Sequence, residues 1–457
     1  MKSVKFHRRP GSPARDGSVL VITLWVALGL VALALYFGQS MSLELRAADQ
    51  RVAAFEADHA IDGATRYATY VLSQVETSGV LPEPTTYSRE AVPVGQSLFW
   101  FIGRDPQVAA NAVTTRPYFA LVDESSKLNI NTATVEMLQG LPGMTAEIAA
   151  AIVDWRDTDS TVTSTGGAED DTYLLRNPAS HCKNGPFETL DELRLVYGMD
   201  LLLLYGEDTN LNGVMDANEN DGDASPPEDN RNGRLDPGFF EYLTVYSRIP
   251  NTTTNGTARV NITQNGFVQQ LRTVLQTVLS TDRATQILRN FNGPNVTVRS
   301  LPEFYTRSRM TLDEFVQIEE YLTLSAGQYM TGLVNVNTAS EAVLACIPGI
   351  GADKASSLVA YRQSNPDKRK TVAWVTEVLD NQSLAQAGRF LTGRSYQYTA
   401  DIAAVGHYGR GYRRSRVVFE TSSGVPQILY RQDLGSLGWA LGQETRQKLS
   451  TLTANLR

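Results

Sequence analysis

The chain has 457 residues, of which 42% are hydrophobic and 20% charged, a globular composition whose length predicts two or more domains. The formal net charge of −8 argues against a nucleic-acid coat protein. The chain has only two cysteines and four histidines, which argues against a disulfide framework, a zinc site and histidine-based catalysis. We therefore expect a protein that is not an enzyme.

A basic leader and an apolar segment open the chain. Residues 1–17 hold five Lys or Arg side chains and one acidic side chain, and residues 18–37 carry no charge. About 20 apolar residues cross a bilayer as a helix, and the basic flank predicts a cytoplasmic N-terminus with the body outside. A cleaved secretory signal peptide, with small residues at 38–40, and a plain signal anchor are two interpretations.

A third interpretation comes from the residues beyond the apolar segment. Between Met41 and Val75 the only helix-breaking residue is Gly63, and apolar residues recur there at near-helical spacing. A basic leader that ends in glycine, before a membrane helix that continues as an amphipathic one, resembles a type IV prepilin. The resemblance implies cleavage between Gly17 and Ser18.

One position departs from most pilins. Ile22 stands where the resemblance leads us to expect glutamate, as the fifth residue after cleavage. A glutamate there would pair with a neighbouring subunit's terminal amine inside the bilayer, where an unpaired charge is costly. Its absence suits a subunit with no neighbour ahead of it, and is typical of the K-type minor pseudopilins of type II secretion systems.

The body of the chain contains an internal repeat. Residues 128–133, Leu-Asn-Ile-Asn-Thr-Ala, recur as Val-Asn-Val-Asn-Thr-Ala at 334–339, and the same offset aligns Arg156 with Arg362. One offset over this length predicts two copies of a helix, a tight turn and a second helix. A degenerate middle copy is weakly indicated by Asn-containing residues 260–263 and by residues 311–315.

The turn of the second copy resembles a helix-hairpin-helix motif. Backbone N–H groups at such a helix start can hold a phosphate, so a membrane-anchored DNA receptor of the competence type is the alternative function. Its contacts would be Gly349, Gly351 and Lys354. The first copy is acidic and lacks the second glycine, and one mildly basic hairpin supplies few phosphate contacts. We expect the copies to be packing units.

An acidic region lies after the first copy. Segment 208–219 matches the twelve-residue calcium loop, with glycine at position six and oxygen ligands at the expected places. The expected ligands are Asp208, Asn210, Asn212, Val214, Asp216 and Glu219. A less complete loop begins twenty residues later, with Glu228, Asn230, Asn232, Arg234 and Asp236 in the corresponding places. The dense negative charge favours bound calcium in a structural role over a solvated acidic linker.

A weaker cation site is indicated in the insert that the first copy carries. Its candidate ligands are Asp157, Asp159, Glu169 and Asp170. Acidic loops often only face water, and no sequence feature pairs Cys182 with Cys346 or keeps them apart.

The remaining signals are strand-like. Aromatic and β-branched runs fall at 97–102, 117–122, 242–246, 396–405, 416–420 and 427–431. We expect one antiparallel sheet packed on the N-terminal helix, hence an α+β, type IV pilin-like fold with an inserted all-α region and calcium loops. The expected segments are 1–17 (leader), 18–37 (transmembrane part), 38–126 (helix and first strands), 127–206 (first helical unit), 207–248 (calcium loops and strand), 249–330 (middle helical segment), 331–390 (second helical unit) and 391–457 (last strands).

Asn-Xaa-Asn-Thr-Ala units that interrupt a pilin fold resemble the general secretion pathway protein K family. The resemblance implies a non-enzymatic minor pseudopilin that caps the pseudopilus tip and initiates its assembly for protein export. It implies a single-pass protein of the bacterial inner membrane, with its body in the periplasm and its leader removed by prepilin peptidase, with prepilin methylation. The implied partners are other minor pseudopilins in a hetero-oligomeric tip complex.

Overall fold

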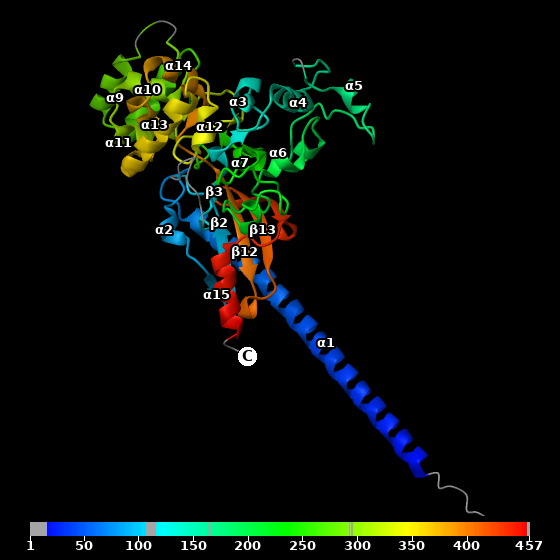
Figure 1. The fold of residues 1–457 in the computed structure, drawn as a ribbon. Coiled ribbons are helices and arrows are strands. Elements are labelled where there is room, and N and C mark those ends of the chain that lie inside the picture. Colours follow the sequence, from blue (N-terminus) through cyan, green and yellow to red (C-terminus); the bar gives the residue numbers. More distant parts are fainter. Residues whose placement is uncertain (1–15, 107–115, 164–165, 292, 294–295, 455–457) are drawn as a thin grey trace, which may run out of the picture.

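A computed structural model describes residues 16–106, 116–163, 166–291, 293 and 296–454. Its longest element is helix α1 (Asp16–Ser73), whose N-terminal half projects from the body as a rod (Figure 1). Among the described residues this is the one helix that is long and apolar enough to cross a membrane. The C-terminal half packs on the sheet, so one helix joins the apolar segment to the folded body.

The central sheet is antiparallel. Its strands are β1 (Val92–Val94), β2 (Ser97–Ile102), β12 (Gln397–Val405), β13 (Arg413–Glu420) and β14 (Gln427–Asp433), in the order β1-β2-β12-β13-β14, with β3 (Val122–Asp123) also pairing with β12. Because side chains alternate across a strand, β2 and β12 serve two cores. Phe99, Phe101 and Ile402 pack on the alanine-rich face of α1, and Trp100 and Ala403 pack on the other side with residues of helix α15 (Gly442–Ala454).

The turn between β12 and β13 grips α1. A Cβ atom on Gly406 would lie 2.1 Å from the Ala53 carbonyl oxygen, and one on Gly411 would lie 2.3 Å from the backbone of Ala53. The ring nitrogens of His407 contact Asp49 Oδ1 at 3.0 Å and Glu56 Oε2 at 2.7 Å. The turn therefore contacts α1 over residues 49–56, and the apolar part of α1 on the N-terminal side of these residues makes no contact that buries it.

Three helical units share one plan. Each begins on a short strand that pairs in parallel with a closing Leu-Thr strand: β4 (Leu128–Asn129) with β5 (Leu243–Thr244), β7 (Val260–Asn261) with β8 (Leu322–Thr323), and β10 (Val334–Asn335) with β11 (Leu391–Thr392). We name them the first, middle and last units. The residue after each opening strand donates its N–H to the closing threonine carbonyl, at 2.9, 3.1 and 3.0 Å.

The units differ in what lies between their strands. The first holds α3 (Val135–Gln139), α4 (Ala146–Arg156), η2 (Leu190–Leu195), η3 (Ala217–Glu219) and short helices α5 (Asp170–Tyr173), α6 (Leu201–Tyr205) and α7 (Phe239–Tyr242). The middle unit holds α8 (Phe267–Val278), α9 (Thr281–Arg289), α10 (Leu301–Ser308) and α11 (Leu312–Glu319); the last holds α12 (Glu341–Ala345), α13 (Gly351–Ser364), η5 (Ala373–Glu377) and α14 (Asn381–Ala387). Smaller elements outside the units include α2 (Pro84–Tyr87), η1 (Glu124–Ser126), and the antiparallel pair β6 (Arg248–Pro250) and β9 (Tyr329–Thr331).

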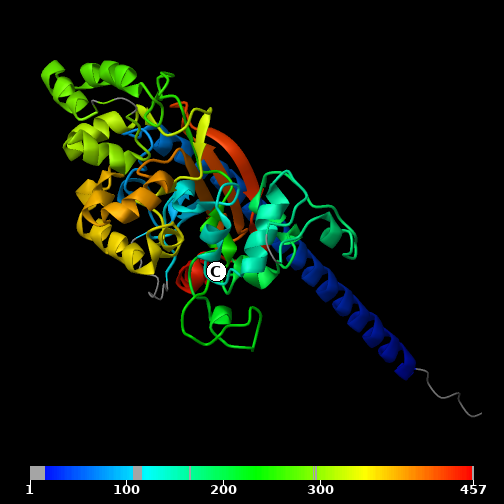
Figure 2. The same cartoon turned by 90° about the horizontal axis from the view of Figure 1, so that it is seen from above.

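A single hydrophobic core runs through all three units. Seen from above, α4 and α5 of the first unit lie on one side of the sheet, and the middle and last units lie on the other (Figure 2). The first and last units touch at equivalent positions, because a Cβ on Gly140 would meet Cys346 Sγ at 3.1 Å. Cys182 and Cys346 are both free and buried.

Equivalent arginines close the first and last units. Arg362 donates to the carbonyls of Val336 and Ala339 at 2.9 and 2.6 Å, and Arg156 donates to the carbonyls of Ile130 and Ala133. The offset that aligned these arginines in the sequence therefore corresponds to one repeated contact. In it, an arginine near the end of a helix donates hydrogen bonds to the carbonyls of the unit's opening turn.

The long helix packed on an antiparallel sheet confirms the predicted α+β class, and two strand predictions were wrong. Residues 242–246 do not join the central sheet, because Leu243 and Thr244 pair in parallel with β4 inside the first unit. Of 117–122, only Val122 lies in a strand, with an isolated bridge at Tyr118. Both runs are extended and apolar, and sequence alone does not say which partner they take.

Candidate metal centre

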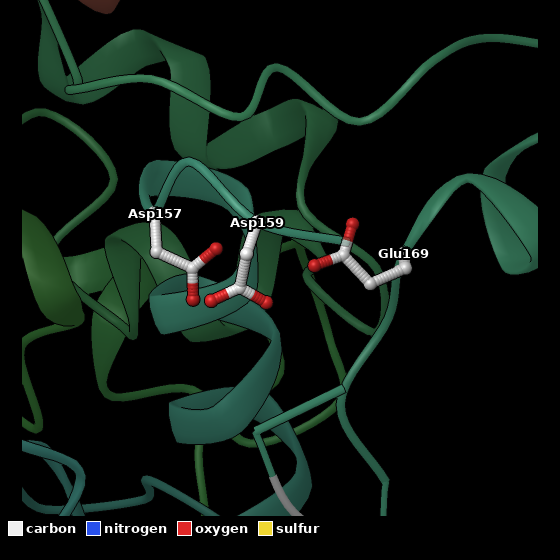
Figure 3. Close-up of side chains that lie close together, drawn as sticks. All are labelled: Asp157, Asp159 and Glu169. Atoms are coloured by element: carbon white, nitrogen blue, oxygen red, sulfur yellow. The ribbon is translucent and has the colours of Figure 1, made fainter. Parts of the chain in front are cut away.

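Three carboxylates of the first unit converge. Asp157 comes directly after the last residue of α4, Asp159 lies two residues further, and Glu169 precedes α5. One oxygen from each lies within 4.8 Å of the others. Figure 3 shows the Glu169 carboxylate pointing toward Asp159, with Asp157 on the far side. The end of one helix and the start of the next thus bring together side chains that are ten and twelve residues apart.

This cluster holds oxygen atoms that have no hydrogen-bond partner among the described residues. They are both carboxylate oxygens of Glu169 and Oδ1 of Asp157, and the amide oxygen of Asn184 has none either. Glu169 is only 4% exposed. Asn184 is not one of the three clustered residues, although its neighbour Gly185 donates its N–H to the Trp155 carbonyl at 3.4 Å. Buried polar atoms nearly always have hydrogen-bond partners, so these unpartnered oxygens are unusual. Oxygen atoms with free lone pairs are the ligands that a hard cation such as calcium takes.

Electrostatics points the same way. Burial raises the pKa of Glu169, and the nearby charges of Asp154 and Asp157 raise it further. Burial, with Asp159 and Asp154, likewise raises the pKa of Asp157. Without a counter-charge these carboxylates repel one another in a poorly solvated place.

The scaffold around the cluster is well tied. Asp154 is fully buried and accepts the N–H groups of Thr163 and Ala168, each at 2.8 Å. Asp170, which the sequence grouped with the cluster, lies outside it: its carboxylate contacts His181 Nδ1 at 3.0 Å and the Cys182 N–H at 2.7 Å. Asp154 and Asp170 therefore shape the loops, and Asp157, Asp159 and Glu169 make up the cluster.

The first predicted calcium loop is compact. Asp208 accepts the N–H groups of Asn212 and Gly213 at 2.9 and 2.8 Å, and Asp216 Oδ2 accepts the side-chain amides of Asn210 and Asn212 at 2.7 and 3.0 Å. Gly213 has φ +71°, as the sharp turn requires. The expected ligand residues therefore enclose one small volume.

Two acids close this loop. The Glu219 carboxylate accepts the Asp216 N–H at 3.0 Å, and burial raises its pKa to about 8. Burial also raises the pKa of Asp208, although Arg104 lies 3.5 Å away. Val214 N–H is held by Asn212 Oδ1 at 2.7 Å. The residues present fit a cation bound by oxygen ligands.

The second loop repeats this geometry. Asp236 Oδ2 accepts the amides of Asn230 and Asn232 at 2.6 and 2.8 Å, and Asn232 Oδ1 accepts the Arg234 N–H at 2.7 Å. Among the described contacts of this loop, none involves the side chain of Glu228. Position twelve, where the pattern expects a glutamate, is Phe239.

A residue outside the pattern takes the closing place. Glu207 accepts the Asp236 N–H at 2.9 Å, as Glu219 does for Asp216, and also accepts the Asn230 N–H at 3.1 Å. Glu207 directly precedes the first loop and is buried. Sequence reasoning missed this residue, although the missing glutamate at position twelve signalled that a carboxylate had to come from elsewhere.

The helix-hairpin-helix turn of the last unit is partly covered. Gly349 has φ +86°, and a Cβ there would lie 2.8 Å from the side chain of Gln386 on α14. Lys354 Nζ lies 3.2 Å from Asp380 and also contacts Ser383. Gly351, with φ +64°, opens α13 in free space. The cation expected to meet a phosphate is thus already paired.

Comparison with known proteins gives two family matches. Residues 120–204 match the model of the first domain of type II secretion system protein K, and residues 331–390 match the helix-hairpin-helix motif. Over residues 120–204 this chain is therefore similar to type II secretion system protein K. This stretch contains the carboxylate cluster and most of the first unit.

Two individual proteins are similar. Protein K of the Klebsiella pneumoniae type II secretion system is 35% identical over 85 residues, which is 18% of this chain and 26% of that protein. The match thus spans about a quarter of that curated relative. The crystal structure of the GspK-GspI-GspJ complex from enterotoxigenic Escherichia coli aligns with 84% of this chain and 97% of that chain, at 13% identity and a TM-score of 0.38.

Proposed function

We propose that this chain is a K-type minor pseudopilin of a type II secretion system, a non-enzymatic subunit that caps the pseudopilus tip and initiates its assembly. The observation that carries the proposal is the match to protein K over residues 120–204. It occurs in a chain whose apolar helix, the one such helix among the described residues, continues into a part that packs on the sheet. The partners we propose are other minor pseudopilins, by analogy with the complex that the similar Escherichia coli protein forms.

The proposal gives the N-terminal half of α1 its role. Prepilin peptidase would cut between Gly17 and Ser18, in the first turn of α1, and the apolar segment would anchor the chain in the bacterial inner membrane, with its body in the periplasm. The exposed apolar side chains of α1 below the grip on residues 49–56 would pack on partner helices. Three helical units make the body too wide to repeat along a thin filament, which supports a place at its end.

The test is the intact mass and N-terminal residue of the protein isolated from its native membrane. We expect a chain that begins at Ser18 with a methylated amine and co-purifies with other minor pseudopilins. A chain that begins at Met1 would contradict prepilin processing, and one that begins at Met41 would indicate a released secreted protein.

We further propose calcium as a structural ion, held by Asp157, Asp159 and Glu169 and by the two loops. Terbium, a luminescent substitute for calcium, tests the sites separately because tryptophan sensitises it at short range. Trp155 lies two residues before Asp157, and the Trp439 carbonyl accepts the Asn210 amide at 3.2 Å. Trp155→Phe should remove the cluster's signal and Trp439→Phe that of the first loop. Unchanged luminescence in both variants would refute this assignment.

The alternative is a membrane-anchored helix-hairpin-helix protein that binds DNA, favoured only by the motif match at 331–390. The pairing of Lys354 with Asp380 and the cover over Gly349 argue against it. A titration with duplex DNA at rising salt separates the two, because phosphate-mediated affinity falls steeply with salt. A pseudopilin should show no such binding.

A further inference from the structure

The first unit exposes large apolar side chains that its own core does not use. They are Leu174, Leu175, Leu195, Tyr197, Leu201 and Leu202, and we call them the leucine patch. Leu175 is 88% exposed and Leu201 is 63% exposed. Isolated exposed leucines are ordinary, but a cluster on one unit marks an interaction site.

Hydrogen bonds connect the parts of the patch. Arg176, next to Leu175, donates to the Leu195 carbonyl at 2.7 Å, and the Tyr197 N–H bonds the Tyr173 hydroxyl at 2.9 Å. Arg194 of η2 contacts the hydroxyl of Tyr205, which ends α6. The loop after α5, η2 and α6 therefore form one connected surface.

Helix α6 shows why folding does not explain the patch. Its sequence is Leu-Leu-Leu-Leu-Tyr, yet only Leu204 is buried. Leu203 and Tyr205 also pack partly against the core, whereas the two leucines at the start of the helix keep apolar surface in water and add nothing to that packing. The excess apolar area is available to a partner.

The charges around the patch define that partner. Each basic side chain here has a partner: Lys183 pairs with Glu192 at 2.6 Å, Arg194 lies 3.5 Å from Asp191, and Arg176 donates to the Leu195 carbonyl at 2.7 Å. The exposed acids Asp171 and Asp200 form no ion pair among the described residues, and Glu188 is 83% exposed. A ligand that covers the leucines would meet net negative charge at their border.

The bilayer is excluded as the occupant by position. The first unit lies at the end of the molecule opposite the free N-terminal part of α1 (Figure 1). A surface at that end meets proteins beyond the membrane.

We propose that the leucine patch docks an amphipathic protein segment that is aliphatic on one side and carries lysine or arginine beside it. This inference goes beyond the proposed function, since neither membrane anchoring nor cation binding needs these side chains. Docking would bury the leucines and pair Asp171, Asp200 and Glu188 with the basic residues of the segment.

The test uses the full chain in phosphatidylcholine nanodiscs and a fluorescent amphipathic helical peptide of leucine and lysine, with a glutamate-for-lysine peptide as its match. The double variant Leu175→Ser, Leu201→Ser should weaken lysine-peptide binding at least about tenfold and keep the wild-type thermal midpoint. The control is Val425→Ser, which alters a 66% exposed apolar side chain beside β14 and should bind as wild type.

Three results would overturn the inference. They are equal affinity in the double variant and the wild type, equal binding of the glutamate peptide, and sedimentation evidence of a dimer that the double variant dissolves, since a second copy would then cover the patch. Each is independent of N-terminal processing and terbium binding, so failure here leaves the proposed function untouched.

Discussion

Replacing Glu169 with glutamine should change stability in opposite directions with and without calcium. The Glu169 carboxylate is buried, has only the weak thiol donor of Cys182 beside it among the described residues and lies near other acids. An unpartnered buried polar group costs about 1–3 kcal/mol, and more when charged. In chelator, removing the charge should raise the free energy of unfolding by about 1 kcal/mol, or roughly 2–4 °C in midpoint. In calcium at 100 times its Kd, losing a ligand should remove most of the roughly 2.7 kcal/mol that binding supplies.

Thermal unfolding in chelator and in calcium measures both signs. The matched control is Glu188→Gln in the same unit, because Glu188 is 83% exposed and 3.9 Å from its nearest cation; it should change neither midpoint. If Glu169→Gln lowers both midpoints equally, Glu169 is an ordinary structural acid and the reasoning about a cation is refuted.

Three further predictions concern the loops, the α1 grip and the repeat. The folded-state pKa of Glu219 is raised from 4.5 to about 8, so the stability that its protonated form contributes is present at low pH and is lost as pH rises between those values. In chelator the free energy of unfolding should therefore fall over this pH range by up to a few kcal/mol, and in calcium it should fall little. Equal pH profiles in the two conditions would contradict the cation site. Gly411→Ala should lower the free energy of unfolding in denaturant by at least about 2 kcal/mol, because its Cβ would meet the α1 backbone. The control Gly424→Ala, also at positive φ but in open space, should cost about 1 kcal/mol. Equal losses would show that the contact between this turn and α1 does not stabilise the protein. Arg362→Met should cost roughly 3 kcal/mol, because it leaves the carbonyls of Val336, Ala339 and Pro106 without this donor, and a loss near 0.5 kcal/mol would show that the repeated contact is incidental.

The sequence predicts the elements whose periodicity is strong. The helix beyond Met41 and the runs that became β2, β12, β13 and β14 lie within three residues of their predicted bounds. Partner choice is what the sequence lacks: Leu243-Thr244 is as strand-like as any of these runs, yet it closes a helical unit. The same Leu-Thr pair closes the other two units, at 322–323 and 391–392, so the signal was present as a repeat rather than as a propensity.

The candidate site divides in the same way. Fixed spacing of asparagine, aspartate and glycine predicts the two loops, because their ligands come from one short segment. Glu207 reaches its place through the path of the chain, so no local pattern includes it. The grouping of Asp157, Asp159 and Glu169 was indicated by charge, but only the structure separates Asp170 from it and leaves the Glu169 oxygens without a hydrogen-bond partner among the described residues.

The position of the first loop gives its proposed calcium ion a mechanical role. The Leu211 carbonyl accepts from Arg104, which lies just beyond β2, at 3.2 Å, and from Arg414 of β13 at 2.9 Å. Arg414 is itself held by Asp401 of β12 at 2.7 and 2.8 Å. The side chain of Leu211 belongs to the core of the helical units. One loop residue thus joins that core to the strands that carry α1, and an ion that fixes the loop fixes how the helical region sits on the sheet. The proposed place at the tip of an assembly requires that fixed relation, because the proposed partners would hold α1 while whatever meets the tip would contact the helical units.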